Sequence, residues 1–198
     1  MNLHRLLLQR ESAGRPVTVG LIGAGKFGTM FLAQARLTPG MHVLGLADLD
    51  VERAQRQLRV CGWPEQAFAA GSLAQAYKNR STHVTQDATA LLACSEIDVI
   101  VEATGLPAAG IRHALGSIAN GKHIVMVNVE ADALAGPLLA RKAQSSGVVY
   151  SLAWGDQPAL ICEHVDWARA CGFHVVAAGK GTRYEPHYHG STPDTLWE

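Results

Sequence analysis

The most chemically specific stretch of the sequence is a glycine-rich run at residues 20–28, GLIGAGKFG. It carries the spacing G-x-G-x-x-G, after an apolar stretch typical of a buried strand and before a helical pattern. In this context the three glycines permit a tight turn, close backbone approach to a pyrophosphate, and close helix–strand packing. The alternative is a glycine-rich turn that binds nothing. The predicted phosphate-binding residues are Gly23, Ala24, Gly25, Lys26, Phe27 and Gly28.

Asp48 is the second candidate, at the end of the next apolar run. It lies about twenty residues past Gly28, where a carboxylate can bind both hydroxyls of an adenosine ribose. Because a carboxylate repels a 2′-phosphate, Asp48 favours NAD over NADP. Asp48 could instead cap the helix that follows, although Asp50 is better placed for that role.

Polar residues also follow two later apolar runs. Thr104 and Gly105 close the first of these runs, in EATG, and Asn128 and Glu130 close the second, in VNVEAD. Because the carboxyl ends of parallel strands line one crevice, we expect these side chains near a nicotinamide ribose. Alternatively, Glu130 or the nearby Asp132 caps a helix.

Alternating apolar runs and helical patterns extend over most of the chain. Near-continuous apolar strands separated by helices indicate a parallel sheet covered on both faces, an α/β doubly wound Rossmann fold. A leading helix at 3–11 is expected on the outside of the sheet, and residues 62–86 are expected to hold a loop and a short helix. The predicted strands are 16–23, 42–48, 83–86, 97–104, 122–128, 148–153 and 174–179, and the other predicted helices are 26–37, 51–62, 107–121, 131–147 and 157–172.

The composition favours a soluble globular protein. Hydrophobic residues make up 48% of the 198, and 17 basic residues balance 17 acidic ones. This balance gives no indication of nucleic acid or anionic membrane as a partner. No apolar run is long enough to span a membrane, and the four cysteines form no C-x-x-C pair. We therefore expect a cytoplasmic protein with reduced thiols.

Three stretches together resemble a known family: residues 20–54, DVIVEATG, and KHIVMVNVEADALAGPLLA. They are similar to the NAD-binding domain of homoserine dehydrogenase-type enzymes. More closely, they resemble the deoxyxylulose-phosphate reductoisomerase-like (DRL-type) oxidoreductases of some bacteria, which WGDQPAL and the tail GKGTRYEPHYHGSTPDT also match. Homoserine dehydrogenases have lysine directly after the asparagine of this region. Val129 follows Asn128 here, which counts against homoserine chemistry.

The resemblance implies a longer protein. Residues 1–178 would be the NAD(P)-binding domain, and 179–198 the start of a catalytic domain that is otherwise absent. The implied activity is hydride transfer to or from a sugar-phosphate or polyol-type substrate with NADPH, whereas Asp48 favours NADH. The alternatives are a truncated, non-catalytic dinucleotide-binding fragment and a simple homoserine dehydrogenase-like enzyme.

The resemblance also suggests catalytic residues, each with a structural alternative. Lys180 could polarise a carbonyl, His187 could transfer a proton, and Arg183 could clamp a phosphate. Lys180 could equally be a solvated loop charge, and Asp156 could be a helix cap. No metal site is predicted, because His187 and His189 supply only two ligands. The candidate catalytic residues are Lys180, His187, Glu130 and Asp156. We expect a small-molecule substrate, and self-association through an exposed strand edge at 174–179.

Overall fold

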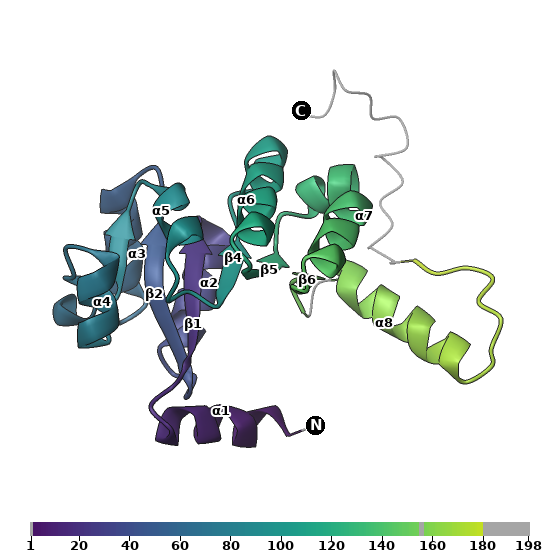
Figure 1. Ribbon diagram of the computed structural model, residues 1–198, viewed down its shortest axis with the longest axis horizontal. Coiled ribbons are helices and arrows are strands. Elements are labelled where there is room, and N and C mark those ends of the chain that lie inside the picture. Colours follow the sequence, from purple (N-terminus) through teal and green to yellow (C-terminus); the bar gives the residue numbers. More distant parts are fainter. Residues whose placement is uncertain (1, 155–156, 180–198) are drawn as a thin grey trace, which may run out of the picture. The chain divides into compact units, whose positions relative to one another are not determined.

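The structure is a computed structural model that describes residues 2–154 and 157–179 (Figure 1). The chain divides into two compact units, Met1–Ala153 and Trp154–Glu198. The first unit holds the whole sheet. Of the second, the structure describes one helix and the segment after it. The domain boundary predicted at residue 178 stays a prediction.

The first unit is built on one parallel sheet of six strands. Their order is β3-β2-β1-β4-β5-β6. From β1 the chain first adds β2 and β3 on one side, and then adds β4, β5 and β6 on the other side. The carboxyl ends of β1 and β4 lie side by side where the direction of winding reverses, which is the usual ligand position in such sheets. The strands are β1 Val17–Ile22, β2 Met41–Ala47, β3 His83–Thr85, β4 Val99–Glu102, β5 His123–Met126 and β6 Tyr150–Leu152.

Helices cover both faces of this sheet (Figure 1). One core cluster joins α2 and α3 to one face through Leu32, Ala54 and Leu58. The other cluster packs helices α4, α5, α6 and α7 against the opposite face, with Leu91 and Leu139 fully buried. The helices are α1 Leu3–Ser12, α2 Lys26–Ala35, α3 Val51–Val60, the 3-10 turn η1 Glu65–Phe68, α4 Leu73–Asn79, α5 Ala88–Ala93, α6 Pro107–Ala119, α7 Val129–Ser145 and α8 Gln157–Ala170. The doubly wound α/β prediction is confirmed.

Two local predictions differ from the structure. Residues 174–179 form no strand, and Val176 among them is 88% exposed. An apolar run becomes a strand only where a neighbouring strand supplies hydrogen-bond partners. The self-association expected from a strand edge there loses that basis, and the oligomeric state stays a prediction. The short helix α5 was not foreseen. Its six residues lie between Asp87, whose carboxylate caps it, and the turn at Cys94.

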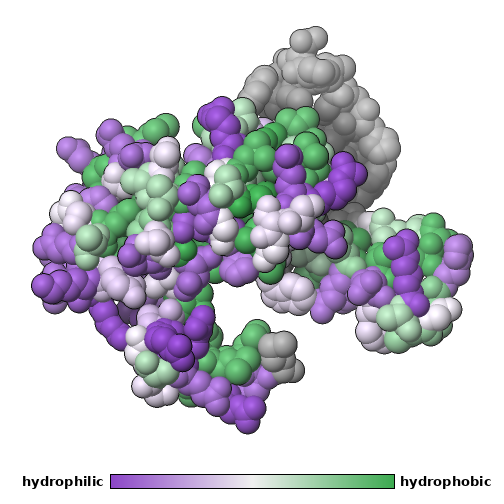
Figure 2. All heavy atoms as spheres, viewed as in Figure 1, coloured by the Kyte–Doolittle hydropathy of each residue, from purple (hydrophilic) through white to green (hydrophobic). Residues whose placement is uncertain are grey.

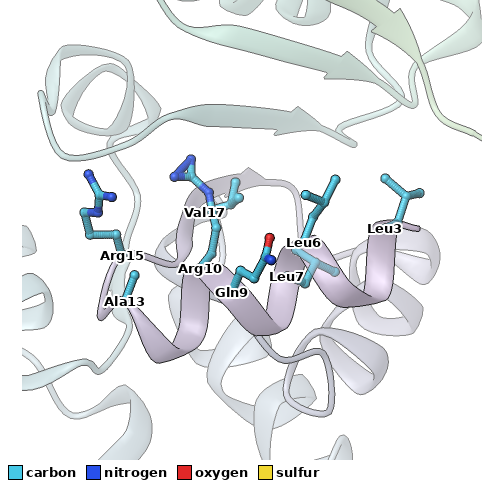
Figure 3. Close-up of a pocket in the computed structure, with 8 residues that line it drawn as sticks. All are labelled: Leu3, Leu6, Leu7, Gln9, Arg10, Ala13, Arg15 and Val17. Carbon is cyan, nitrogen blue, oxygen red and sulfur yellow. The ribbon is translucent and has the colours of Figure 1, made fainter. Parts of the chain in front are cut away.

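Helix α1 lies at the amino ends of β1 and β2 rather than over a face of the sheet (Figure 1). Gly40, just before β2, packs so closely against it that a Cβ there would lie 2.1 Å from the carbonyl oxygen of Leu7. None of its residues is buried, and apolar side chains are exposed along it (Figure 2). Figure 3 shows the residues that line a hollow beside it, among them Leu3, Leu6 and Val17. Its polar lining residues are Gln9, Arg10 and Arg15, which include no carboxylate, histidine or nucleophile, so it is not a candidate active site.

Lys122 is a buried lysine that ties the start of β5 to the turn before β4. Its side chain is 4% exposed, and its ammonium donates hydrogen bonds to the carbonyls of Cys94 and Ile97, the latter at 3.0 Å. We expect Lys122→Met to lower the free energy of unfolding by about 2 kcal/mol, because buried carbonyls lose their donor. Urea unfolding measures this, with the exposed Lys142→Met as control. Equal, small losses in both variants would contradict the role of Lys122.

Candidate functional site

A cavity of about 470 Å³ opens at the carboxyl ends of β1, β2 and β4. Its walls come from four places: the glycine loop after β1, the segment from β2 into α3, the segment after β3, and the segment from β4 into α6. The lining residues include Gly23, Gly25, Asp48, Arg53, Thr104, Leu106, Arg112 and His113.

The three glycines of the loop differ in what surrounds them. Gly23 has φ +103°, and a Cβ on it would lie 2.6 Å from the carbonyl oxygen of Ala103, so the turn requires glycine. A Cβ on Gly28 would lie 2.1 Å from the carbonyl oxygen of Gly23. A Cβ on Gly25 would meet no described atom within 4 Å, and Gly25 lines the cavity. The loop is therefore closely packed at Gly23 and Gly28 and open to the cavity at Gly25.

Helix α2 begins directly at this opening. Its N-cap is Gly25, and within the described chain no side chain caps its first N–H groups. Uncapped N–H groups together with the helix dipole favour an anion, such as a phosphate, at this point. Lys26 and Phe27 are the first two helical residues, and both side chains are exposed. The observed backbone thus fits a pyrophosphate.

Asp48 follows β2 and anchors the glycine loop. Its carboxylate is 5% exposed and accepts the Ala24 N–H at 2.7 Å through one oxygen. The other oxygen accepts the Asp50 N–H at 2.9 Å and the Arg53 guanidinium at 2.8 Å. The helix cap of α3 is Asp50, whose side chain accepts the Arg53 N–H. Asp48 is therefore not the cap and holds the loop instead.

Basic side chains line the cavity around Asp48. Arg53 comes from the first turn of α3, while Arg112 and His113 come from α6. Asp48 is the one carboxylate among the residues lining the described cavity. The charge balance at this end of the site therefore favours an anionic ligand.

Glu102, at the end of β4, is fully buried beneath the cavity. Its Oε1 accepts the Thr104 hydroxyl at 2.6 Å and lies 3.1 Å from Nδ1 of His113. Its Oε2 has no hydrogen-bond partner among the described residues. A buried carboxylate with one unpaired oxygen is costly, and the contacts that Glu102 does make fix the positions of Thr104 and His113.

Asn128 extends this polar network to β5 and α7. Its side chain is 2% exposed, caps α7 by accepting the Ala131 N–H, and donates to the Leu106 carbonyl at 3.0 Å. Its amide nitrogen also lies 3.5 Å from the Thr104 hydroxyl. Asn128 therefore holds the segment after β4 in place.

A second, partly buried contact joins α7 to β6. The Tyr150 hydroxyl donates to Asp132 at 2.8 Å. Burial raises the pKa of Tyr150, and the hydrogen bond to Asp132 raises it further. Asp132 is therefore engaged by Tyr150, while Asn128 caps the helix.

The predicted cofactor-binding residues all lie at the carboxyl-terminal ends of the strands. Gly105 has φ +72° and a Cβ there would meet no described atom, so the segment after β4 is open as well. Glu130 is exposed in the first turn of α7. Asp156, Lys180 and His187 lie outside the described residues, and their catalytic roles stay predictions.

The sequence interpretation assigned no role to four residues at the cavity and beneath it. Arg53, Arg112 and His113 carry no motif, and only the packing of α3 and α6 places them at the cavity. Glu102 did have a signal, since an acidic residue ends an otherwise apolar strand, IVE.

Comparison with known families agrees with this geometry. Residues 19–152 match the family model of the homoserine dehydrogenase NAD-binding domain. The chain belongs to this family. Residues 155–198 match a second model, the catalytic domain of the oxidoreductase DRL. The predicted resemblance to both is confirmed, and the open glycine loop is that of an NAD(P)-binding oxidoreductase domain. No curated protein sequence matches the chain.

Solved structures share the fold of this NAD-binding domain. A homoserine dehydrogenase from Thiobacillus denitrificans has 24% identity and a TM-score of 0.54, over 70% of this chain and 29% of that one. A myo-inositol dehydrogenase from Lactobacillus casei, in complex with NAD(H) and myo-inositol, has 21% identity and a TM-score of 0.55, over 77% and 42%. A biliverdin reductase from Synechocystis, in complex with biliverdin and NADP+, has 18% identity and a TM-score of 0.54, over 69% of this chain and 37% of that one. The alignments therefore span less than half of each of these proteins.

No described helix is long and apolar enough to cross a membrane. No group of three or more histidine, cysteine, aspartate or glutamate side chains in residues 2–154 and 157–179 could hold a metal ion.

Proposed function

We propose that this chain is the dinucleotide-binding part of an NAD(P)-dependent oxidoreductase that transfers hydride to or from a sugar-phosphate or polyol-type substrate. The observation that carries the proposal is the opening at Gly25, where the uncapped start of α2 faces a cavity with basic side chains. The bound nicotinamide would supply the hydride chemistry. The residues of this chain bind the phosphates, and the Glu102–Thr104–Asn128 network fixes the edge where the ring would lie.

The substrate class rests on two comparisons. Residues 155–198 match the DRL catalytic domain, and a structural neighbour binds myo-inositol, a polyol. Both favour a hydroxyl-rich substrate over an amino acid. Val129 in place of lysine further disfavours homoserine. For the dinucleotide, Asp48 by itself favours NAD(H), whereas the family resemblance favours NADP(H).

Transfer of deuterium tests the proposal. The chain is incubated with NADPH or NADH carrying deuterium at the transferable ring position, together with a panel of ketose phosphates and oxidised polyols. We expect mass spectrometry to find deuterium in one class of product, and the carbon skeleton of that product separates reduction from rearrangement. The matched control is Gly25→Asp. A chain that binds dinucleotide but labels no member of the panel would contradict hydride transfer to this substrate class by the chain itself and would favour a binding-only role.

A further inference from the structure

A second cavity, of about 620 Å³, lies at the amino ends of β1, β2 and β4, at the opposite end of these strands from the dinucleotide cavity. Its walls come from the end of α1 and the loop into β1, from β2, from the end of α4, and from the turn before β4. None of its lining residues lines the dinucleotide cavity. A ligand bound here would therefore leave the dinucleotide site open.

Basic side chains outnumber acidic ones in the lining of this cavity. The four basic residues are Arg10, Arg15, Lys78 and Arg80, and the two acidic ones are Glu96 and Asp98. Among the described residues, Arg10, Arg15 and Lys78 form no ion pair, and all three are exposed. In Figure 3 the Arg10 and Arg15 side chains extend in the same direction. Asp98, by contrast, already accepts the Thr18 N–H and hydroxyl, both at 2.9 Å.

Arg80 holds two walls of the cavity together. It is the one non-glycine residue of the described chain with a positive φ, +52°, a conformation that costs about 1 kcal/mol. Its guanidinium donates to the Gly14 carbonyl at 3.1 Å and lies 3.8 Å from the Glu11 carboxylate. Glu11 in turn accepts the Gly40 N–H at 2.9 Å. These contacts join the end of α4 to the end of α1 and fix the positions of the other basic residues.

Helix dipoles explain only part of this basic lining. Arg10 and Lys78 lie in the last turns of α1 and α4, where a cation is favoured by about 0.3–1 kcal/mol. That reason does not extend to Arg15, which lies in the loop after α1. Nor does it require the three cations to line the same cavity. Their convergence is what a bound anion would use.

We propose that this cavity is a second binding site, for a phosphorylated small molecule whose phosphate groups are held by Arg10, Arg15 and Lys78. The planar guanidinium fork matches the geometry of phosphate oxygens, and the lysine adds a compact charge. Because two carboxylates also line the cavity, a ligand with two or more negative charges competes with them better than a monoanion does. The ligand would bridge α1 to α4. This site does not depend on the dinucleotide.

Inorganic pyrophosphate is the probe, and calorimetry at low salt measures its binding to the full chain. The glycine loop also favours phosphates, so the titrations use the Gly25→Asp variant, in which binding at the second cavity should persist. Arg15→Gln and Lys78→Gln, each added to that variant, should weaken it about fivefold. The matched controls are Arg141→Gln and Lys142→Gln, which remove exposed charges from α7 that line neither cavity and should leave the affinity unchanged.

A variant that strengthens binding separates the site from local damage. Glu96→Gln removes an exposed carboxylate from the lining and keeps an oxygen acceptor, so pyrophosphate should bind about threefold more tightly. A disturbed fold would not give tighter binding. Equal affinities in the Arg15→Gln variant and its Arg141→Gln control, or no gain in Glu96→Gln, would overturn the phosphate site.

Hydrogen exchange on the wild-type chain tests the location without any substitution. Pyrophosphate should slow exchange at residues 9–15 and 73–80, which NADPH should not do. Protection confined to residues 23–30 would overturn the second site and leave the dinucleotide site standing.

Discussion

Replacing Gly25 with aspartate is expected to abolish dinucleotide binding and leave the fold as stable as before. A side chain on Gly25 would meet no described atom, so nothing in the folded chain opposes it. Gly25 has φ −73° and ψ −160°, which aspartate adopts readily, and aspartate is a preferred N-cap. Its carboxylate would take the N–H groups of α2 and place a negative charge where the phosphates bind. We expect the dissociation constant to rise at least a hundredfold, about 2.7 kcal/mol or more.

Calorimetry with NADPH and thermal unfolding measure the two halves of this prediction. The melting temperature should stay the same or rise, since a new cap contributes up to about 1 kcal/mol. Ser72→Asp is the control, because it puts the same charge at the N-cap of α4, which does not line the cavity. Unchanged NADPH affinity in the Gly25→Asp variant would contradict the placement of the phosphates.

Replacing Gly28 with valine should have the opposite consequence, because the fold itself should be lost or weakened. Even a Cβ at Gly28 would lie 2.1 Å from the carbonyl oxygen of Gly23. The obstructing atom is backbone, so it cannot rotate away as a side chain would. Helix α2 and the loop must separate, and we expect the free energy of unfolding to fall by about 3 kcal/mol.

Urea unfolding measures this loss, and Met30→Val is the matched control. Met30 is 55% exposed on the same helix, so its replacement reports only the lower helix propensity of valine. Dinucleotide binding should weaken in the Gly28→Val variant as well, because the loop moves. If both valine variants unfold at the same urea concentration, the close packing at Gly28 contributes nothing to stability.

The sheet could be predicted because its strands are buried on both faces. Runs such as VTVGLI and VIVE are apolar without alternation, which is characteristic of parallel strands between two layers of helices. The same rule failed at HVVAAG, residues 174–179. An apolar run of that composition shows only that a strand is possible, whereas pairing requires a neighbouring strand with free hydrogen-bond partners.

The binding site could be predicted only where backbone geometry determines it. Gly23 permits a tight turn, Gly25 permits the backbone to approach a pyrophosphate, and Gly28 permits close packing of helix and strand. The structure shows a different environment for each glycine. The charged residues are different, because their effect depends on side chains from separate elements. Asp48 was assigned from its spacing, but the sequence does not show that Arg53 pairs with it or that α6 brings Arg112 to the same cavity.

The central claim is that this chain holds a dinucleotide at the opening of its glycine loop. Calorimetric titration of the 198-residue chain with NADPH and with NADH, alongside circular dichroism to confirm folding, tests it most directly. We predict that the chain binds a dinucleotide at one site. A chain that is folded and binds neither dinucleotide would contradict the claim.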